Sequence, residues 1–201
     1  MNAEDLVLTE DEKDVLQELI NISYGSATAV IAEMLDAFAS LSIPKIEIMC
    51  TKDLIAKSKK LRMASYFFSS QSFIGDFSGE CAFFINEKSA NNLAKHLELE
   101  DKEDLDDAIL ELTNVLTSSL ISKLAQEVDA QVTYAPPNIL KLHLSEMEET
   151  SAIKNNSQVI TIQTQLNFKD QKIRGEIFIL TKDGSIQWLK KQLNNILESL
   201  M

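Results

Sequence analysis

Three polar residues, an aspartate, a glutamate and an asparagine, occur twice in this chain with the same spacing. In each copy the pattern D-x3-E-x2-N is followed by a proline after 22 intervening residues, which gives the pairs Asp14/Asp107, Glu18/Glu111, Asn21/Asn114 and Pro44/Pro137. A carboxylate can pair with a cation, and a carboxamide can accept a hydrogen bond from water while its NH₂ group donates nearby. The set can therefore bind a cation and form hydrogen bonds with water.

The spacing places these residues on one narrow stripe of a helix, at about 100° per residue. The stripe consists of Asp14, Glu18, Asn21 and Gly25 in the first copy, and of Asp107, Glu111, Asn114 and Ser118 in the second. Apolar residues between Val15 and Phe38, and between Leu105 and Leu120, fall on the opposite side. We therefore predict that both Glu/Asn pairs point to solvent, on two faces related by symmetry.

A solvated helix surface is the alternative interpretation of each stripe, but such a surface has no need of asparagine, a mediocre helix former. The small residues one turn later, Gly25 and Ser118, either let another protein approach closely or pack tightly within this chain. Asp14 and Asp107, one turn earlier, either contact a partner or favour the helix N-terminus through its dipole. The sequence leaves both choices open.

The two stripes belong to an internal repeat. When residues 14–44 are placed over residues 107–137, nine of the 31 positions are identical, and Gly79-Glu80 later matches Gly175-Glu176. Such self-similarity indicates a duplicated unit. We predict one domain over residues 1–201, made of two repeats at about 9–98 and 101–200.

Each repeat is expected to begin with a long helix, which positions the stripe. Thr9 and Glu12 fit a capping box for a helix to about Phe38, and Asp101 is a candidate cap for a helix to about Val128. Strands are expected at 45–50, 65–74 and 79–85, then at 138–143, 158–168 and 173–181, with closing helices at 88–97 and 185–200 and a further helical turn considered at 54–61. The predicted fold is α+β: a duplicated helix-plus-three-strand unit with pseudo-twofold symmetry and a mostly antiparallel central sheet flanked by long helices.

The composition excludes several classes of function. The chain has 19 basic and 31 acidic residues, a formal net charge of −12, whereas nucleic acid and anionic membranes need clusters of Lys and Arg. His96 and His143 lie far apart, and no metal, nucleophile or phosphate-loop motif occurs, so no bound metal or cofactor is expected. Cys50 and Cys81 are expected to be buried and reduced, as in a cytoplasmic protein.

The doubled motif and the sequence E-L-I-N-I-S-Y-G-S-A at residues 18–27 resemble the CheC / CheX / FliY group of chemotaxis phosphatases, and the length is most similar to CheC. Ser23 and Thr117-Ser118 depart from the family pattern but leave Glu and Asn intact. The resemblance implies that the substrate is the aspartyl phosphate of a CheY-type response regulator, which holds its own Mg²⁺. It implies that Asn21 and Asn114 orient the attacking water, and that Glu18 and Glu111 pair with the regulator's active-site lysine.

Two alternatives remain beside a phosphatase. A non-catalytic module that binds CheY, like the middle domain of the flagellar switch protein FliM, is expected to lack the Glu/Asn pairs and to carry a further C-terminal segment, whereas this sequence ends just after its last helix. A regulatory partner of the receptor deamidase CheD is also considered, with the helix Lys88–Leu97 as the surface to examine.

Overall fold

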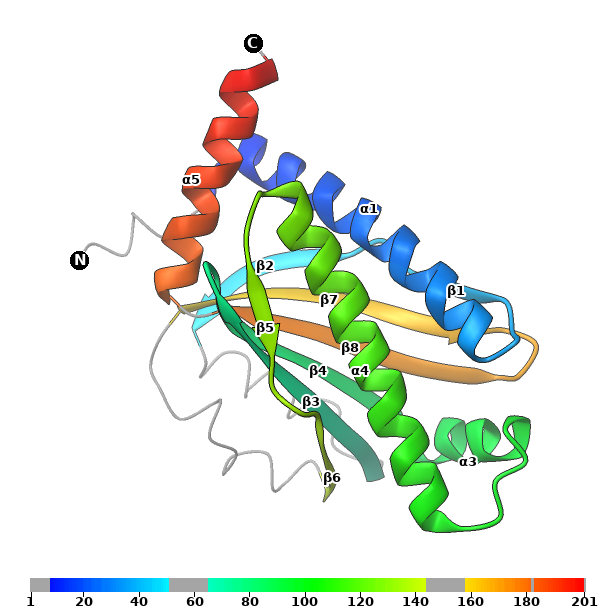
Figure 1. Cartoon of the computed structure of the whole chain (residues 1–201). Coiled ribbons are helices and arrows are strands. Elements are labelled where there is room, and N and C mark those ends of the chain that lie inside the picture. The colour runs from blue at the N-terminus through cyan, green and yellow to red at the C-terminus, as the bar shows by residue number, and fades with distance from the viewer. Residues whose placement is uncertain (1–7, 51–64, 144–157, 182, 201) are drawn as a thin grey trace.

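The computed structural model describes residues 8–50, 65–143, 158–181 and 183–200 (Figure 1). The first half forms α1 (Glu10–Met34), β1 (Ala39–Leu41), β2 (Lys45–Cys50), β3 (Ser65–Gly75), β4 (Gly79–Asn86) and α3 (Glu87–His96). The second half forms α4 (Lys102–Glu127), β5 (Val132–Tyr134), β6 (Asn138–His143), β7 (Gln158–Phe168), β8 (Ile173–Thr181) and α5 (Asp183–Leu200). The candidate helical turn at 54–61 lies outside the described residues.

All eight described strands join one antiparallel sheet. The strand order is β1-β7-β8-β4-β3-β5, with β2 also pairing with β7 and β6 also pairing with β3. The pairing of β4 with β8 joins two half-sheets, one formed by β1, β2, β7 and β8 and the other by β3, β4, β5 and β6, and each half-sheet contains strands from both halves of the chain. The predicted α+β class and antiparallel sheet are therefore confirmed.

The strand pairings around β7 are repeated around β3 at a fixed shift in sequence. Leu41 of β1 pairs with Leu166 of β7, and the residues 93 positions away, Tyr134 of β5 and Phe73 of β3, also pair. The ladders of β2 with β7 and of β6 with β3 agree with the same shift. This register is what a duplicated unit requires, while the twofold axis itself stays a prediction.

The structure differs from the expected unit in two details. Each half has a fourth strand, β1 or β5, of only three residues, which is too short to show an alternating pattern in the sequence. The first helix ends at Met34 rather than near Phe38, because Asp36 takes a left-handed backbone (φ 43°) and Ala37 N–H donates to Ala32 O at 3.0 Å. This is a Schellman-type helix end.

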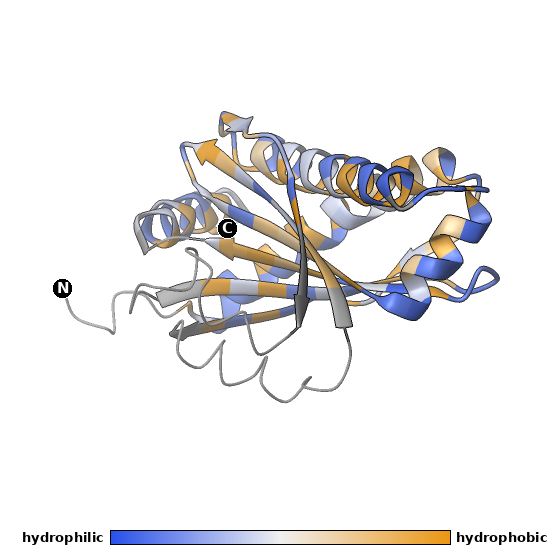
Figure 2. Ribbon diagram, turned by 90° about the horizontal axis from the view of Figure 1, so that it is seen from below, coloured by the Kyte–Doolittle hydropathy of each residue, from blue (hydrophilic) through white to orange (hydrophobic). Residues whose placement is uncertain are grey.

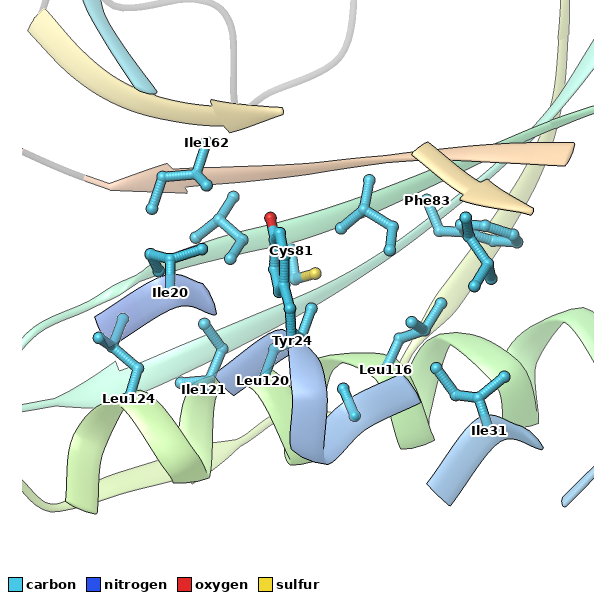
Figure 3. Packing of buried hydrophobic residues seen from close by; sticks show 14 of the residues in the cluster. Ile20, Tyr24, Ile31, Cys81, Phe83, Leu116, Leu120, Ile121, Leu124 and Ile162 are labelled. Atoms are coloured by element: carbon cyan, nitrogen blue, oxygen red, sulfur yellow. The ribbon is translucent and has the colours of Figure 1, made fainter. Parts of the chain in front are cut away.

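The long helices α1 and α4 lie side by side and pack on the sheet, while α5 and α3 lie at opposite ends of this layer (Figure 1). In Figure 2 the helices and the sheet form two layers, and apolar residues recur along the strands. Side chains from α1, α4 and the strands fill the space between the layers, among them Ile20, Leu116 and Phe83 (Figure 3). No helix in the described part of the chain is long and apolar enough to span a membrane.

Cys81 lies at the centre of this core, beside Tyr24 (Figure 3). Its thiol is free and buried, and burial raises its pKa to about 12. The group therefore stays protonated at neutral pH and is unreactive. This agrees with the expectation of a reduced, buried cysteine, and the side chain of Cys50 is outside the described part.

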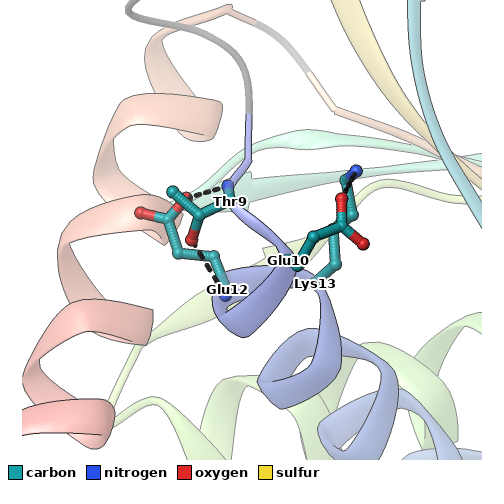
Figure 4. A network of polar contacts seen from close by, with 4 residues as sticks. All are labelled: Thr9, Glu10, Glu12 and Lys13. Carbon is teal, nitrogen blue, oxygen red and sulfur yellow. Dashed lines mark hydrogen bonds and ion pairs between the residues drawn. The ribbon is translucent and has the colours of Figure 1, made fainter.

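The start of α1 is fixed by the predicted capping box (Figure 4). Thr9 N–H donates to Glu12 Oε2 at 2.7 Å, and Glu12 N–H donates to Thr9 Oγ1 at 3.2 Å. Glu12 is only 2% exposed and also accepts a hydrogen bond from Asn194 Nδ2 of α5 at 2.9 Å. One carboxylate therefore caps α1 and ties it to α5. Asp101 occupies the N-cap position of α4 with extended backbone, but its side chain makes no capping bond.

We expect Glu12→Ala to lower the free energy of unfolding by about 1–3 kcal/mol, because it leaves the Thr9 N–H and the Asn194 amide without their acceptor. Chemical denaturation followed by circular dichroism measures the change. The matched control is Glu10→Ala in the same helical turn, where an exposed ion pair with Lys13 is lost and the change should stay within about 0.5 kcal/mol. Equal effects of the two substitutions would contradict this account of α1.

Candidate functional site

The stripe on α1 faces solvent. Asp14, Glu18, Asn21 and Gly25 are all exposed, while Leu16, Leu19, Ile20, Ser23 and Tyr24 of the same helix are buried. No hydrogen bond to the Asn21 side chain is found among the described residues, so its amide is free to meet a partner. The predicted orientation of Glu18 and Asn21 is confirmed.

The stripe on α4 borders a groove of about 530 Å³. Asp107 and Glu111 are exposed, as predicted, and line one side of the groove together with Asn114. The opposite side is formed by residues 134–137, which lead from β5 to β6 and include the matched proline Pro137. The structure thus brings four sequence-predicted residues of the second copy to one concave surface.

Asn114 is half-buried rather than fully exposed. Its Oδ1 accepts a hydrogen bond from Gln71 Nε2 at 3.0 Å, and Gln71 Nε2 also donates to Ala135 O at 2.8 Å. The sequence analysis did not single out Gln71. The available signal was a polar side chain between Ser69 and Phe73 on the buried face of a predicted strand, where an unpaired amide is costly and needs a partner.

The two small residues after the asparagines differ in their surroundings. A Cβ atom at Gly25 would meet no atom within 4 Å, which excludes tight packing within the described chain and leaves close approach by a partner. Ser118 is half-buried and lies outside the groove lining, and its Oγ donates to the backbone O of Asn114 at 2.7 Å. The Ser118 hydroxyl is therefore used within α4.

Three of the nine identities between the repeats have a structural cause. Leu19 and Leu112 are buried in the core, and Asp36 and Asp129 both take left-handed backbone at the ends of α1 and α4. Ala37 and Ala130 each donate the N–H that closes the helix end. These contacts do not explain the matched residues of the two stripes, Asp14/Asp107, Glu18/Glu111 and Asn21/Asn114. Asn114 is half-buried and bonds Gln71, whereas the other five are exposed, and the recurrence of the full set is the strongest sign of a functional role.

Part of the predicted apolar face of the first helix is exposed. Ile22 is 40% exposed, Val30 is 42% exposed, and Phe38 lies beyond the helix at 77%. The buried positions follow a spacing slightly longer than one helical turn, so the buried stripe winds around α1 and leaves Val30 outside it. Ile22 directly follows Asn21, and the α1 stripe therefore has an apolar neighbour at its edge.

The stripes carry one kind of chemistry. Each presents a carboxylate and a carboxamide, and a carboxamide neither titrates nor acts as a nucleophile. No cluster of three or more His, Cys, Asp or Glu side chains suited to a metal occurs in the described part of the chain. Tyr134 at the groove accepts or donates a 2.6 Å hydrogen bond with Ser122, and partial burial raises the pKa of its phenol. The arrangement can hold a water molecule and pair with a cation supplied by another molecule.

Comparisons with known proteins identify the fold and a similarity to one family. The family model described as chemotaxis phosphatase CheX matches residues 67–164, a span that includes α4 with the second Glu/Asn pair. The structure of FliY from Thermotoga maritima is similar with a TM-score of 0.76 at 16% identity, covering 94% of this chain and 98% of that one. CheX from Desulfovibrio desulfuricans gives 0.56 at 15% identity, covering 82% and 99%.

A flagellar switch protein shares the fold as well. The FliM middle domain from H. pylori is similar with a TM-score of 0.61 at 10% identity, covering 92% of this chain and 99% of that one. At these identities the solved structures establish the fold, and the family model adds the relationship to the phosphatases. The chain is thus similar to the CheC, CheX and FliY group of chemotaxis phosphatases, in sequence pattern over residues 67–164 and in fold over most of its length.

Proposed function

We propose that this protein hydrolyses the aspartyl phosphate of a CheY-type response regulator in the cytoplasm and so ends a chemotaxis signal. The observation that carries the proposal is the recurrence of Glu and Asn at matched positions of the α1 and α4 stripes, where Glu18, Asn21 and Glu111 are exposed and Asn114 lines a groove. The relationship to the CheX phosphatase family supports the same reaction.

In the proposed reaction, the regulator brings the phosphoryl group and this chain brings the group that holds water. The oxygen of water attacks phosphorus in line with the leaving carboxylate, the P–O bond to the aspartate breaks, and inorganic phosphate leaves. Asn21 or Asn114 accepts a hydrogen bond from that water through its Oδ1, and its Nδ2 donates a second hydrogen bond nearby. Positioning of this kind lowers a barrier without adding charge.

Glu18 and Glu111 serve as anchors in this proposal. Both carboxylates are exposed and lie on the same stripe as the neighbouring asparagine, so either can reach a lysine of a docked protein. A charge-assisted bond in a partly dry interface fixes how deeply the helix enters. Mg²⁺ is expected in the regulator, where it neutralises charge on the phosphoryl group, and this chain supplies no metal or cofactor to the step.

A module that binds the regulator without catalysis is the second candidate, and the likeness to the FliM middle domain favours it. It would use the same exposed helices for docking. The two candidates differ in the fate of the phosphate, so a phosphate-release assay with phosphorylated receiver domain separates them. A regulatory complex with CheD is compatible with either candidate and is tested by a pull-down with that protein.

We expect Asn21→Ala combined with Asn114→Ala to return dephosphorylation to the regulator's own rate, a loss of at least about 100-fold in stimulated activity. Asn21→Ala removes an exposed amide and should change the free energy of unfolding by less than about 0.5 kcal/mol. Asn114→Ala removes one of the two acceptors of the buried Gln71 amide and should lower the free energy of unfolding by about 1–3 kcal/mol, so circular dichroism must show that the double variant is folded. Phosphate release from phosphorylated receiver domain gives the rate, and the single variants give the share of each site.

The control for this experiment is Asn91→Ala, which removes an exposed asparagine from α3, away from both stripes. It should leave the rate unchanged. A double variant that clears phosphorylated regulator at the wild-type rate would refute the mechanism. A wild-type protein that binds the regulator but releases no phosphate would favour the binding module.

Gly25 provides a second test, because substitutions at this residue can show whether a partner approaches α1 closely and, independently, how much the glycine destabilises the helix. Gly25→Ala should raise the free energy of unfolding by about 0.5–1 kcal/mol, since alanine restricts the unfolded chain and its Cβ meets open space. In an Asn114→Ala background, Gly25→Leu should raise KM for the phosphorylated regulator at least about fivefold while remaining folded. An unchanged KM would show that no partner surface approaches α1 at this residue.

A further inference from the structure

Gln71 connects the sheet to the candidate catalytic amide of α4. It lies on β3, is only 2% exposed, and extends toward the helix layer. Its Nε2 donates to Asn114 Oδ1 at 3.0 Å and to the backbone O of Ala135 at 2.8 Å. Two elements on opposite sides of the groove are therefore joined through one side chain.

These two bonds fix the orientation of the Gln71 amide. An NH₂ group has two protons, and here each has an acceptor, while Gln71 Oε1 has no hydrogen-bond partner among the described residues. Rotating the amide by half a turn would lose both bonds and place Gln71 Oε1 against Asn114 Oδ1 and Ala135 O. The NH₂ group of Gln71 therefore stays directed at Asn114 Oδ1, and this bond restrains the position of that oxygen.

The equivalent site on α1 lacks this connection between a strand side chain and the asparagine. Thr164 of β7 corresponds to Gln71, because Gln163 and Ser70, which precede them, pair with the corresponding residues Lys45 and Asn138. Thr164 Oγ1 donates to Ser42 O at 2.6 Å. The threonine therefore bonds the loop between β1 and β2 and leaves Asn21 without a restraint.

The correspondence extends to the loops. Ala135 N–H donates to Ser72 O at 3.0 Å, and Ser42 N–H donates to Gln165 O at the same distance. Gln71 and Thr164 thus make the same contact with equivalent loops, and only Gln71 makes the additional contact with an asparagine.

We propose that Gln71 is a positioning residue for Asn114 and makes the α4 site more active per bound regulator than the α1 site. The inference rests on the proposed phosphatase function. A held Asn114 Oδ1 keeps one lone pair for water, and the bond from Gln71 polarises the amide so that Nδ2 donates more strongly. Asn21 has to be ordered when the partner docks, which costs side-chain entropy at that moment.

The test isolates the α4 site in an Asn21→Ala background and compares Gln71→Thr with Gln71→Met. Threonine is chosen because Thr164 shows that this side chain can bond the equivalent loop carbonyl, Ser42 O, without restraining Asn21, whereas methionine removes both bonds. Gln71→Thr should lower kcat for phosphorylated receiver domain about threefold to tenfold, the value of one hydrogen bond, and change KM less than about twofold. Gln71→Met should lower kcat at least as much.

A double-mutant cycle distinguishes positioning from a general structural effect. When Asn114 is already alanine, the kinetic effect of Gln71→Thr should disappear, because there is no amide left to position. An equal drop in both backgrounds, an effect on KM alone, or no effect on kcat would each overturn the proposal. If the wild-type protein does not accelerate phosphate release at all, the proposed function fails, and the kinetic role of Gln71 fails with it.

A measurement on the free protein needs no activity. The side-chain amide of Asn114 should have a higher NMR order parameter than that of Asn21, and Gln71→Thr should reduce it to the Asn21 value. Equal order parameters in the wild-type protein would overturn the positioning role even if the phosphatase function holds.

Discussion

The antiparallel pairing of β4 with β8 is the contact on which the arrangement depends, because it joins two half-sheets into one. Glycine is required at both ends of this ladder. A Cβ at Gly79 would lie 2.2 Å from Leu180 O, and one at Gly175 would lie 2.3 Å from the ring of Phe83. The matched Gly-Glu pairs of the two repeats therefore reflect close strand approach. Joined in this way, the half-sheets place α1 and α4 side by side over one core.

Sharing one core has a consequence for the two stripes. Each long helix uses its apolar side for the sheet and for the other helix, so only the outer side remains free to diverge. Packing and helix ends account for Leu19, Asp36 and their counterparts, whereas Glu18 and Asn21 meet no such demand. Both halves carry Glu and Asn at these matched positions although only Asn114 is held by another side chain, and this recurrence is best explained by a common task outside the chain.

Local signals in the sequence were enough for most of the fold. The capping box at Thr9 and Glu12, the alternation along β7 and β8, and the repeat itself each depend on residues close in the chain or on a fixed shift. Strands β1 and β5 could not be predicted because they consist of three residues and exist only through pairing with β7 and β3. The contact of Gln71 with Asn114 was missed for the same reason: it joins residues 43 positions apart and follows from strand register.

The net charge of −12 determines what kind of recognition the proposed reaction needs. The active site of a receiver domain is itself acidic, so the overall field of this protein would slow rather than speed their encounter. Docking then has to depend on short-range contacts, a carboxylate meeting one lysine and an amide entering beside the phosphate. The two helices meet this demand differently. The α1 stripe is fully exposed with the apolar Ile22 at its edge, which favours contact, whereas α4 offers a groove with its amide already held by Gln71, which favours the chemical step.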